Sequence, residues 1–185
     1  MKMHHRTIIV VCAVLAFAAV SNSGSAEIGR AAPNCTFTPV GGAQPYDMQR
    51  FRGKVLYVDF WASWCPPCAR SFPFMNALDR ELRDRGLQVL GINLDEDPED
   101  AKRFLEKYPA SFTVVSATGG QCPQDYGVTA MPSSYLVDRH GVIRYVHLGF
   151  RAGEAEQLRA RVEALLAEST GGEAIGQVGS GATTQ

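Results

Sequence analysis

The stretch at positions 59–68, DFWASWCPPC, limits the possible folds of this chain most strongly. It ends the short apolar run VLYVDF, which is typical of a strand buried on both faces of a sheet. Apolar residues then recur at helical spacing (Met75, Leu78, Leu82) before Gly86, so a helix is expected over 65–85. Cysteines three apart in a first helical turn lie close enough to form a disulfide. The stretch therefore predicts a strand, a turn and a helix that begins with a bondable cysteine pair.

Strands and helices alternate through the rest of the chain. Asp97 and Pro98 are an N-cap and a first-turn proline, and they predict a second helix with Ala101 and Phe104 on its apolar face. Pro73 is expected to kink the first helix. The remaining elements are a hairpin within 27–54, strands at 87–94 and 112–115, a second hairpin of 134–137 with 142–147, and a helix at 154–167. This order indicates an α/β fold with a mixed sheet.

The segment 1–26 has the features of a secretory signal peptide. Lys2 and Arg6 precede an apolar run of 13 residues at 8–20, and a small polar stretch leads to Ala26. A membrane span needs about 20 residues, so cleavage is the favoured interpretation and an uncleaved anchor the alternative. A domain over 27–168 follows, and the Gly-, Ser- and Thr-rich tail 169–185 is expected to be disordered.

Charge and cysteine content narrow the possible partners. Without Lys2 and Arg6, the 18 basic residues of the chain become 16 against 19 acidic ones, which gives no electrostatic reason to bind nucleic acid or an anionic membrane. The exported chain keeps four cysteines. Because an oxidising compartment permits disulfides, all four are candidates for redox chemistry.

The CPPC motif predicts disulfide exchange. Cys65 would face the positive end of the helix dipole, which stabilises the thiolate that attacks a disulfide. Cys68, one turn further along, would then displace the product from the mixed disulfide. Pro66 and Pro67 have no amide hydrogen and stiffen the turn, so they are expected to tune the redox potential and to contact the substrate.

Two other interpretations of the motif carry less weight. A zinc site needs a second ligand pair, but no second CxxC follows, and His140 and His147 lie at no ligand spacing. A purely structural disulfide across so short a loop would remove little entropy from the unfolded chain. We therefore expect no metal, and no cofactor other than the Cys65/Cys68 pair itself.

The segment DFWASWCPPC resembles the active site of thioredoxins. Together with the secretory segment, it is similar to the exported TlpA/ResA/CcmG-type thioredoxin-like proteins over 35–167. The resemblance implies a thioredoxin fold: a central mixed sheet flanked by helices, with an N-terminal hairpin and a strand–helix insertion in the 64 positions from Cys68 to Pro132. It also implies a cis bond between Met131 and Pro132 beside Cys65, where the Met131 backbone could pair with an extended substrate.

Four further residues are candidates for the site, Asp59 and Glu96 through the same resemblance and the two tryptophans through their apolar rings. Asp59 would take a proton from Cys68 during resolution, or else be a carboxylate held by backbone hydrogen bonds. Glu96 would be an active-site acid, or else a solvated acid before a helix. Trp61 and Trp64 would shield the site and contact a substrate, although core packing is the favoured interpretation for Trp61.

Cys35 and Cys122 lie far from the motif in the sequence. They either form a second, structural disulfide that ties the N-terminal hairpin to the loop before Pro132, or remain two free thiols.

The resemblance implies a periplasmic enzyme that reduces protein disulfides; a monomer is expected, although the sequence leaves the oligomeric state open. A membrane reductase of the DsbD/CcdA kind would supply its electrons, and its clients would be apocytochrome c or copper-site proteins of respiration. The alternatives are an oxidant or isomerase of the same fold, or a copper-binding chaperone. Thioredoxin-like copper carriers use CxxxC with a downstream histidine, and the spacing of Cys65 and Cys68 is one residue short.

Overall fold

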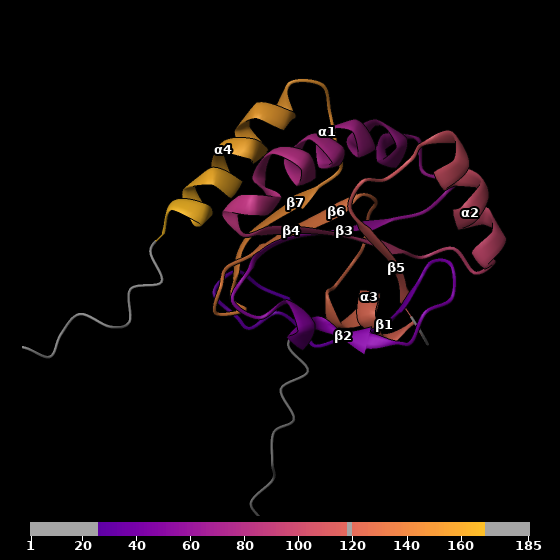
Figure 1. The fold of residues 1–185 in the computed structure, drawn as a ribbon, viewed down its shortest axis with the longest axis horizontal. Helices are drawn as coiled ribbons and strands as arrows, with labels where there is room; N and C mark the ends of the chain where they lie inside the picture. Colours follow the sequence, from indigo (N-terminus) through magenta and orange to yellow (C-terminus); the bar gives the residue numbers. More distant parts are fainter. Residues whose placement is uncertain (1–25, 118–119, 169–185) are drawn as a thin grey trace, which may run out of the picture.

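One mixed sheet organises the part of the chain that the computed structural model describes, residues 26–117 and 120–168 (Figure 1). Its strands are β1 (Thr36–Pro39), β2 (Tyr46–Asp47), β3 (Val55–Trp61), β4 (Leu87–Asn93), β5 (Thr113–Ala117), β6 (Ser133–Val137) and β7 (Ile143–Leu148). They lie in the order β2-β1-β5-β4-β3-β6-β7. The central strands β3, β4 and β5 are parallel, and the flanking strands are antiparallel to their neighbours. Apart from Ala26, the predicted signal segment 1–26 lies outside the described residues, as does the predicted tail 169–185.

Helices cover both faces of the sheet. Their bounds are α1 (Pro66–Leu82), α2 (Pro98–Lys107), α3 (Gln121–Asp125) and α4 (Glu154–Ala167), with 3-10 turns at Met48–Phe51 and Arg83–Arg85. Figure 1 shows α1 and α4 along one face and α3 on the other. The mixed sheet with flanking helices confirms the α/β thioredoxin architecture that the sequence predicted.

The central strand β3 divides the core in two, because successive side chains of a strand point to opposite faces. Tyr57 and Trp61 join the cluster beneath α1, α2 and α4, which also contains Cys68. Val58 and Phe60 join the cluster on the face covered by α3 and the N-terminal segment. Asp59 alternates in step with Tyr57 and Trp61, so it points toward the face that carries Cys65 and Cys68.

Most predicted elements are confirmed, with small shifts at their ends. Asp97 caps α2 as expected and accepts a hydrogen bond from the Glu99 amide at 2.9 Å. The strand expected at 112–115 begins one residue later and continues to Ala117, where it pairs with β1. The expectation of a plain loop after this strand is wrong, because residues 121–125 form α3. The first helix continues through Pro73, and the kink expected there stays a prediction.

No helix among the described residues is long and apolar enough to cross a membrane. Apart from Ala26, the predicted signal segment is not among these residues.

Candidate active site

The Cys65/Cys68 pair lies at the start of α1, directly after the turn that follows β3. The two cysteines are joined by a disulfide, with their Cα atoms 5.3 Å apart. Cys65 is the N-cap of α1, and Cys68 lies inside its first turn. Both cysteines are buried, but Cys65 is 4% exposed and lines two cavities that open at the surface, whereas Cys68 is fully buried and lines neither. The fold thus presents one sulfur to a partner and keeps the other behind it.

The two prolines determine which backbone donor reaches the Cys65 sulfur. Pro66 and Pro67 occupy the first positions of α1 and have no N–H to donate. The first backbone N–H of the turn is therefore that of Cys68. Its nitrogen lies 3.2 Å from the Cys65 sulfur and donates a hydrogen bond to it. A single N–H and the positive end of the helix would stabilise a thiolate at Cys65 after reduction.

The bond between Met131 and Pro132 is cis, as the resemblance implied. Pro132 is buried, and its carbonyl accepts a hydrogen bond from the Gly149 amide at 2.7 Å. Within the described residues, no backbone hydrogen bond to the Met131 amide or carbonyl is present. The Met131 backbone is therefore available to an extended partner segment.

An apolar cavity of about 470 Å³ joins Cys65 to Met131. Its lining is formed by Trp64, Cys65, Pro66, Pro67, Leu94, Pro123, Val128, Thr129, Ala130 and Met131. The Trp64 side chain is 68% exposed, whereas Trp61 is fully buried between the rings of Phe72 and Phe104. Trp64 therefore offers apolar surface to a partner, and Trp61 packs in the core.

Asp59 lies in a buried polar chain that joins β3 to β6. Its carboxyl group is fully buried and accepts a hydrogen bond of 2.6 Å from the Ser134 hydroxyl, which itself accepts one of 3.0 Å from Tyr57. The second carboxyl oxygen has no partner among the described residues. Burial raises the pKa of Asp59 to about 7, and the hydrogen bond from Ser134 opposes the rise. Asp59 can thus gain or lose a proton near neutral pH.

The sequence did not reveal the contribution of Ser134 and Tyr57. Ser134 lies opposite Asp59 in the β3–β6 register, 75 positions away in the chain. Burial, and then the neighbouring Asp59, raise the pKa of Tyr57, so its hydroxyl remains a donor. In the sequence, this contact is indicated by Ser133 and Ser134 alone, two polar residues that begin an otherwise apolar strand.

Asp95, rather than Glu96, fixes the turn before the cysteines. Its carboxylate accepts hydrogen bonds from the Ser63 amide at 3.0 Å and the Ser63 hydroxyl at 3.0 Å, and from Asn93 at 2.7 Å. Glu96 is exposed and lines neither cavity at Cys65. The structure therefore does not bring Glu96 together with the other predicted site residues, and Asp95 connects β4 to the nucleophile turn.

Cys35 and Cys122 form a second disulfide, which the sequence left open. Both cysteines are buried, and the bond joins the segment before β1 to α3. Pro123, the next residue of α3, lines the apolar cavity. The second disulfide thus anchors one wall of that cavity.

No group of three or more metal-ligating side chains occurs in the described parts of the chain. The four cysteines there are paired with one another.

Comparison with known proteins decides the family. The redoxin family model matches residues 27–164. The chain belongs to the redoxin family. Curated relatives of this redoxin include ResA, a thiol-disulfide oxidoreductase of Bacillus thuringiensis subsp. konkukian, which is 33% identical over 63% of this chain and 67% of the relative. ResA of Halalkalibacterium halodurans is 31% identical over 72% of this chain and 73% of its own.

Solved structures show the same relationship. A protein assigned as the thiol:disulfide interchange protein DsbE of Chlorobium tepidum is 41% identical, with a TM-score of 0.73 over 77% of this redoxin and 99% of that chain. These matches and the Cys65–Cys68 disulfide identify the redoxin as a thiol-disulfide oxidoreductase with a thioredoxin fold.

Proposed function

We propose that this redoxin reduces disulfides of exported proteins, outside the cytoplasm. The observation that carries the proposal is the asymmetry of the cysteine pair: Cys65 lines an apolar cavity that opens at the surface, whereas Cys68 is fully buried and does not line it. The reduced enzyme would attack a client disulfide through the Cys65 thiolate, forming a Cys65–client disulfide and releasing one client thiolate. Cys68, once deprotonated, would attack the Cys65 sulfur, re-form the enzyme disulfide and release the second thiolate. Two electrons pass to the client, whose thiolates take up two protons.

The chemistry at the prolines supports the reducing direction. An oxidant of this fold has a strongly stabilised thiolate, because stabilising the reduced form raises the potential. Here Pro66 and Pro67 remove two of the backbone donors that could stabilise Cys65, and the Cys68 amide is left. A weakly stabilised thiolate favours a reductant, which needs a dithiol electron donor; we propose a membrane reductase of the DsbD/CcdA kind.

Two features support a periplasmic location. The segment 1–26 has the charge and apolar pattern of a signal peptide. The buried Cys35–Cys122 disulfide is a structural bond of the kind that persists in oxidising compartments. Clients there include apocytochrome c, whose haem cysteines must be reduced, and copper-site proteins of the respiratory chain, and we propose this class as the substrate.

The reduction potential of the Cys65/Cys68 pair tests the direction. The protein would be equilibrated with glutathione or dithiothreitol and followed by tryptophan fluorescence, since Trp64 adjoins the pair. A value below about −220 mV is expected for a reductant, and one near about −120 mV would show an oxidant. Stoichiometric copper retention without turnover of a disulfide would instead support the chaperone alternative.

A further inference from the structure

A groove leads away from Cys65 between α1 and α2. Its first part is a cavity of about 420 Å³ between Cys65 and Ala69 on one side and Phe104 and Tyr108 on the other. A second cavity of about 310 Å³ shares Tyr108 and Lys107 with the first and extends to Arg80 on α1. We call these two cavities together the helix groove. Its lining differs from that of the apolar cavity, which contains Met131 and no residue of α2.

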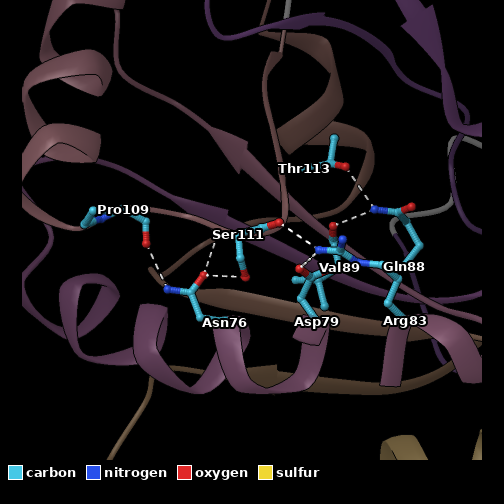
Figure 2. Close-up of polar contacts among 8 residues, drawn as sticks. All are labelled: Asn76, Asp79, Arg83, Gln88, Val89, Pro109, Ser111 and Thr113. Atoms are coloured by element: carbon cyan, nitrogen blue, oxygen red, sulfur yellow. Dashed lines mark hydrogen bonds and ion pairs between the residues drawn. The ribbon is translucent and has the colours of Figure 1, made fainter. Parts of the chain in front are cut away.

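Hydrogen bonds fix the two walls of the helix groove to each other (Figure 2). The Asn76 side chain of α1 donates to the Pro109 carbonyl at 2.8 Å and accepts from the Ser111 amide at 2.7 Å. Arg83 donates to the Ser111 carbonyl at 3.0 Å and pairs with Asp79. Figure 2 shows these groups meeting above α1, where the chain leaves α2 for β5. The position of Lys107 and Tyr108 relative to α1 is therefore set by the fold.

The helix groove carries a positive charge, although the chain as a whole has a net charge of −1. Asp100 and Arg103 both line it and form an ion pair, so they offset each other. Lys107 lies over the Tyr108 ring at 5.3 Å. Within the described residues, neither Lys107 nor Arg80 has a carboxylate at ion-pair distance. Two positive charges therefore line the groove without an acidic partner.

We propose that the helix groove binds an acidic stretch of the client polypeptide, adjacent to the cysteine that reacts with Cys65. The inference rests on the proposed function and specifies its substrate. Cys65 lies at one end of the groove and Arg80 at the other, fifteen positions along α1, which is roughly 22 Å of helix. An extended segment of about seven residues covers that length. Carboxylates in such a segment would meet Lys107 and Arg80, while the other flank of the client cysteine enters the apolar cavity.

Matched peptides test this proposal. Each peptide carries one cysteine in a disulfide with a neutral thiol and about seven residues on one side of that cysteine, enough to cover the helix groove. The four of these residues furthest from the cysteine are either glutamate or glutamine. The four residues are placed before the cysteine in one pair and after it in the other. Reduced wild-type protein is expected to react with the glutamate peptide roughly 3- to 10-fold faster in one of the two placements, since exposed ion pairs contribute about 0.2–1 kcal/mol each. The advantage should shrink at about 0.5 M salt because exposed charges are then screened.

Variants that remove positive charges test whether the helix groove causes the preference for the glutamate peptide. The double variant Lys107→Gln/Arg80→Gln should lose the preference for glutamate. Lys102→Gln/Arg85→Gln changes the net charge equally at exposed positions outside the groove lining and should keep the preference. The control variant Lys102→Gln/Arg85→Gln should also reduce a small neutral aromatic disulfide at the wild-type rate, because neither side chain lines a cavity at Cys65.

The outcomes separate the two proposals. If wild-type protein reduces the neutral disulfide but does not distinguish the peptides in either placement, the acidic client is wrong and the proposed function stands. The same conclusion follows if the control variant loses the preference as fully as Lys107→Gln/Arg80→Gln. If wild-type protein reduces none of these disulfides, the proposed function itself fails.

Discussion

Asp59 is the residue whose protonation should govern the second half of the reaction. Burial raises its pKa to about 7, so the proton-accepting form becomes populated as the pH rises through about 7. The rate at which Cys68 releases a client from Cys65 should therefore rise between pH 6 and 8. Asp59→Asn cannot accept a proton and should slow this step about 10-fold or more, with a flat pH profile. The measurement is stopped-flow release from a preformed mixed disulfide.

Ser134 provides the control for this experiment. Its hydroxyl donates to Asp59 and lowers the pKa of that carboxyl group. Ser134→Ala should consequently move the midpoint of the pH profile upward while leaving its shape intact. Equal release rates in Asp59→Asn and the wild type from pH 6 to 8 would exclude the proton-transfer role.

Single residues could be predicted from the sequence when local spacing carried the information. The CPPC motif, Asp59 six positions before it and the cis-proline all follow from short segments and their resemblance. Asp95 could not be selected from the run DED, because its partner Ser63 lies 32 positions away and only the β3–β4 pairing brings them together. The resemblance offered Glu96 as an active-site acid or else as a solvated acid, and the run DED itself does not show which carboxylate faces the nucleophile turn.

At the scale of elements, the packing of α1, α2 and β5 against the sheet depends on a glycine in β4. A Cβ atom at Gly91 would lie 2.9 Å from a ring carbon of Phe112 and 3.2 Å from the Trp61 indole nitrogen. Both neighbours are buried and cannot move freely. Gly91→Ala should lower the free energy of unfolding by about 1–3 kcal/mol, measured by urea denaturation.

A double-mutant cycle isolates this contact. Phe112→Leu removes the nearest ring atom, so adding Gly91→Ala to that variant should cost less than in the wild type. Identical costs in both backgrounds would show that the loss arises elsewhere in β4.

Elements with strong caps and clear periodicity were predicted well, and short ones were not. Helix α2 has a capping aspartate and a first-turn proline, and its bounds follow from them. Helix α3 has only five residues, no side-chain cap, and a proline inside it, so its local sequence resembles a loop. It is held instead by Cys122, whose disulfide depends on a partner 87 positions away.

At the scale of the whole molecule, the Cys35–Cys122 disulfide should contribute more to stability than the redox pair. It closes a span of 87 positions, and a long closed loop restricts the unfolded chain more than the three-position span of Cys65 and Cys68. Cys35→Ala/Cys122→Ala should therefore lower the free energy of unfolding by about 2–4 kcal/mol under oxidising conditions. Cys65→Ala/Cys68→Ala should cost less in the same urea titration. A larger loss from the redox-pair variant would contradict the loop argument.

The overall architecture followed from the resemblance, but the second disulfide did not. Nothing near Cys35 or Cys122 in the sequence indicates a partner. The two meet because β1 pairs with β5, and β5 leads into α3. Such a long-range arrangement is a property of the sheet order, which short sequence patterns do not contain.

The order of the four cysteines also has a consequence for biosynthesis. Beyond the predicted signal segment, which contains Cys12, a chain that emerges from its N-terminus exposes Cys35, then the reactive pair Cys65 and Cys68, well before Cys122. Four cysteines allow three complete pairings, and the first partners that Cys35 meets are the wrong ones. The nucleophile that exchanges disulfides in other proteins is therefore also the main competitor for Cys35 during the maturation of its own chain.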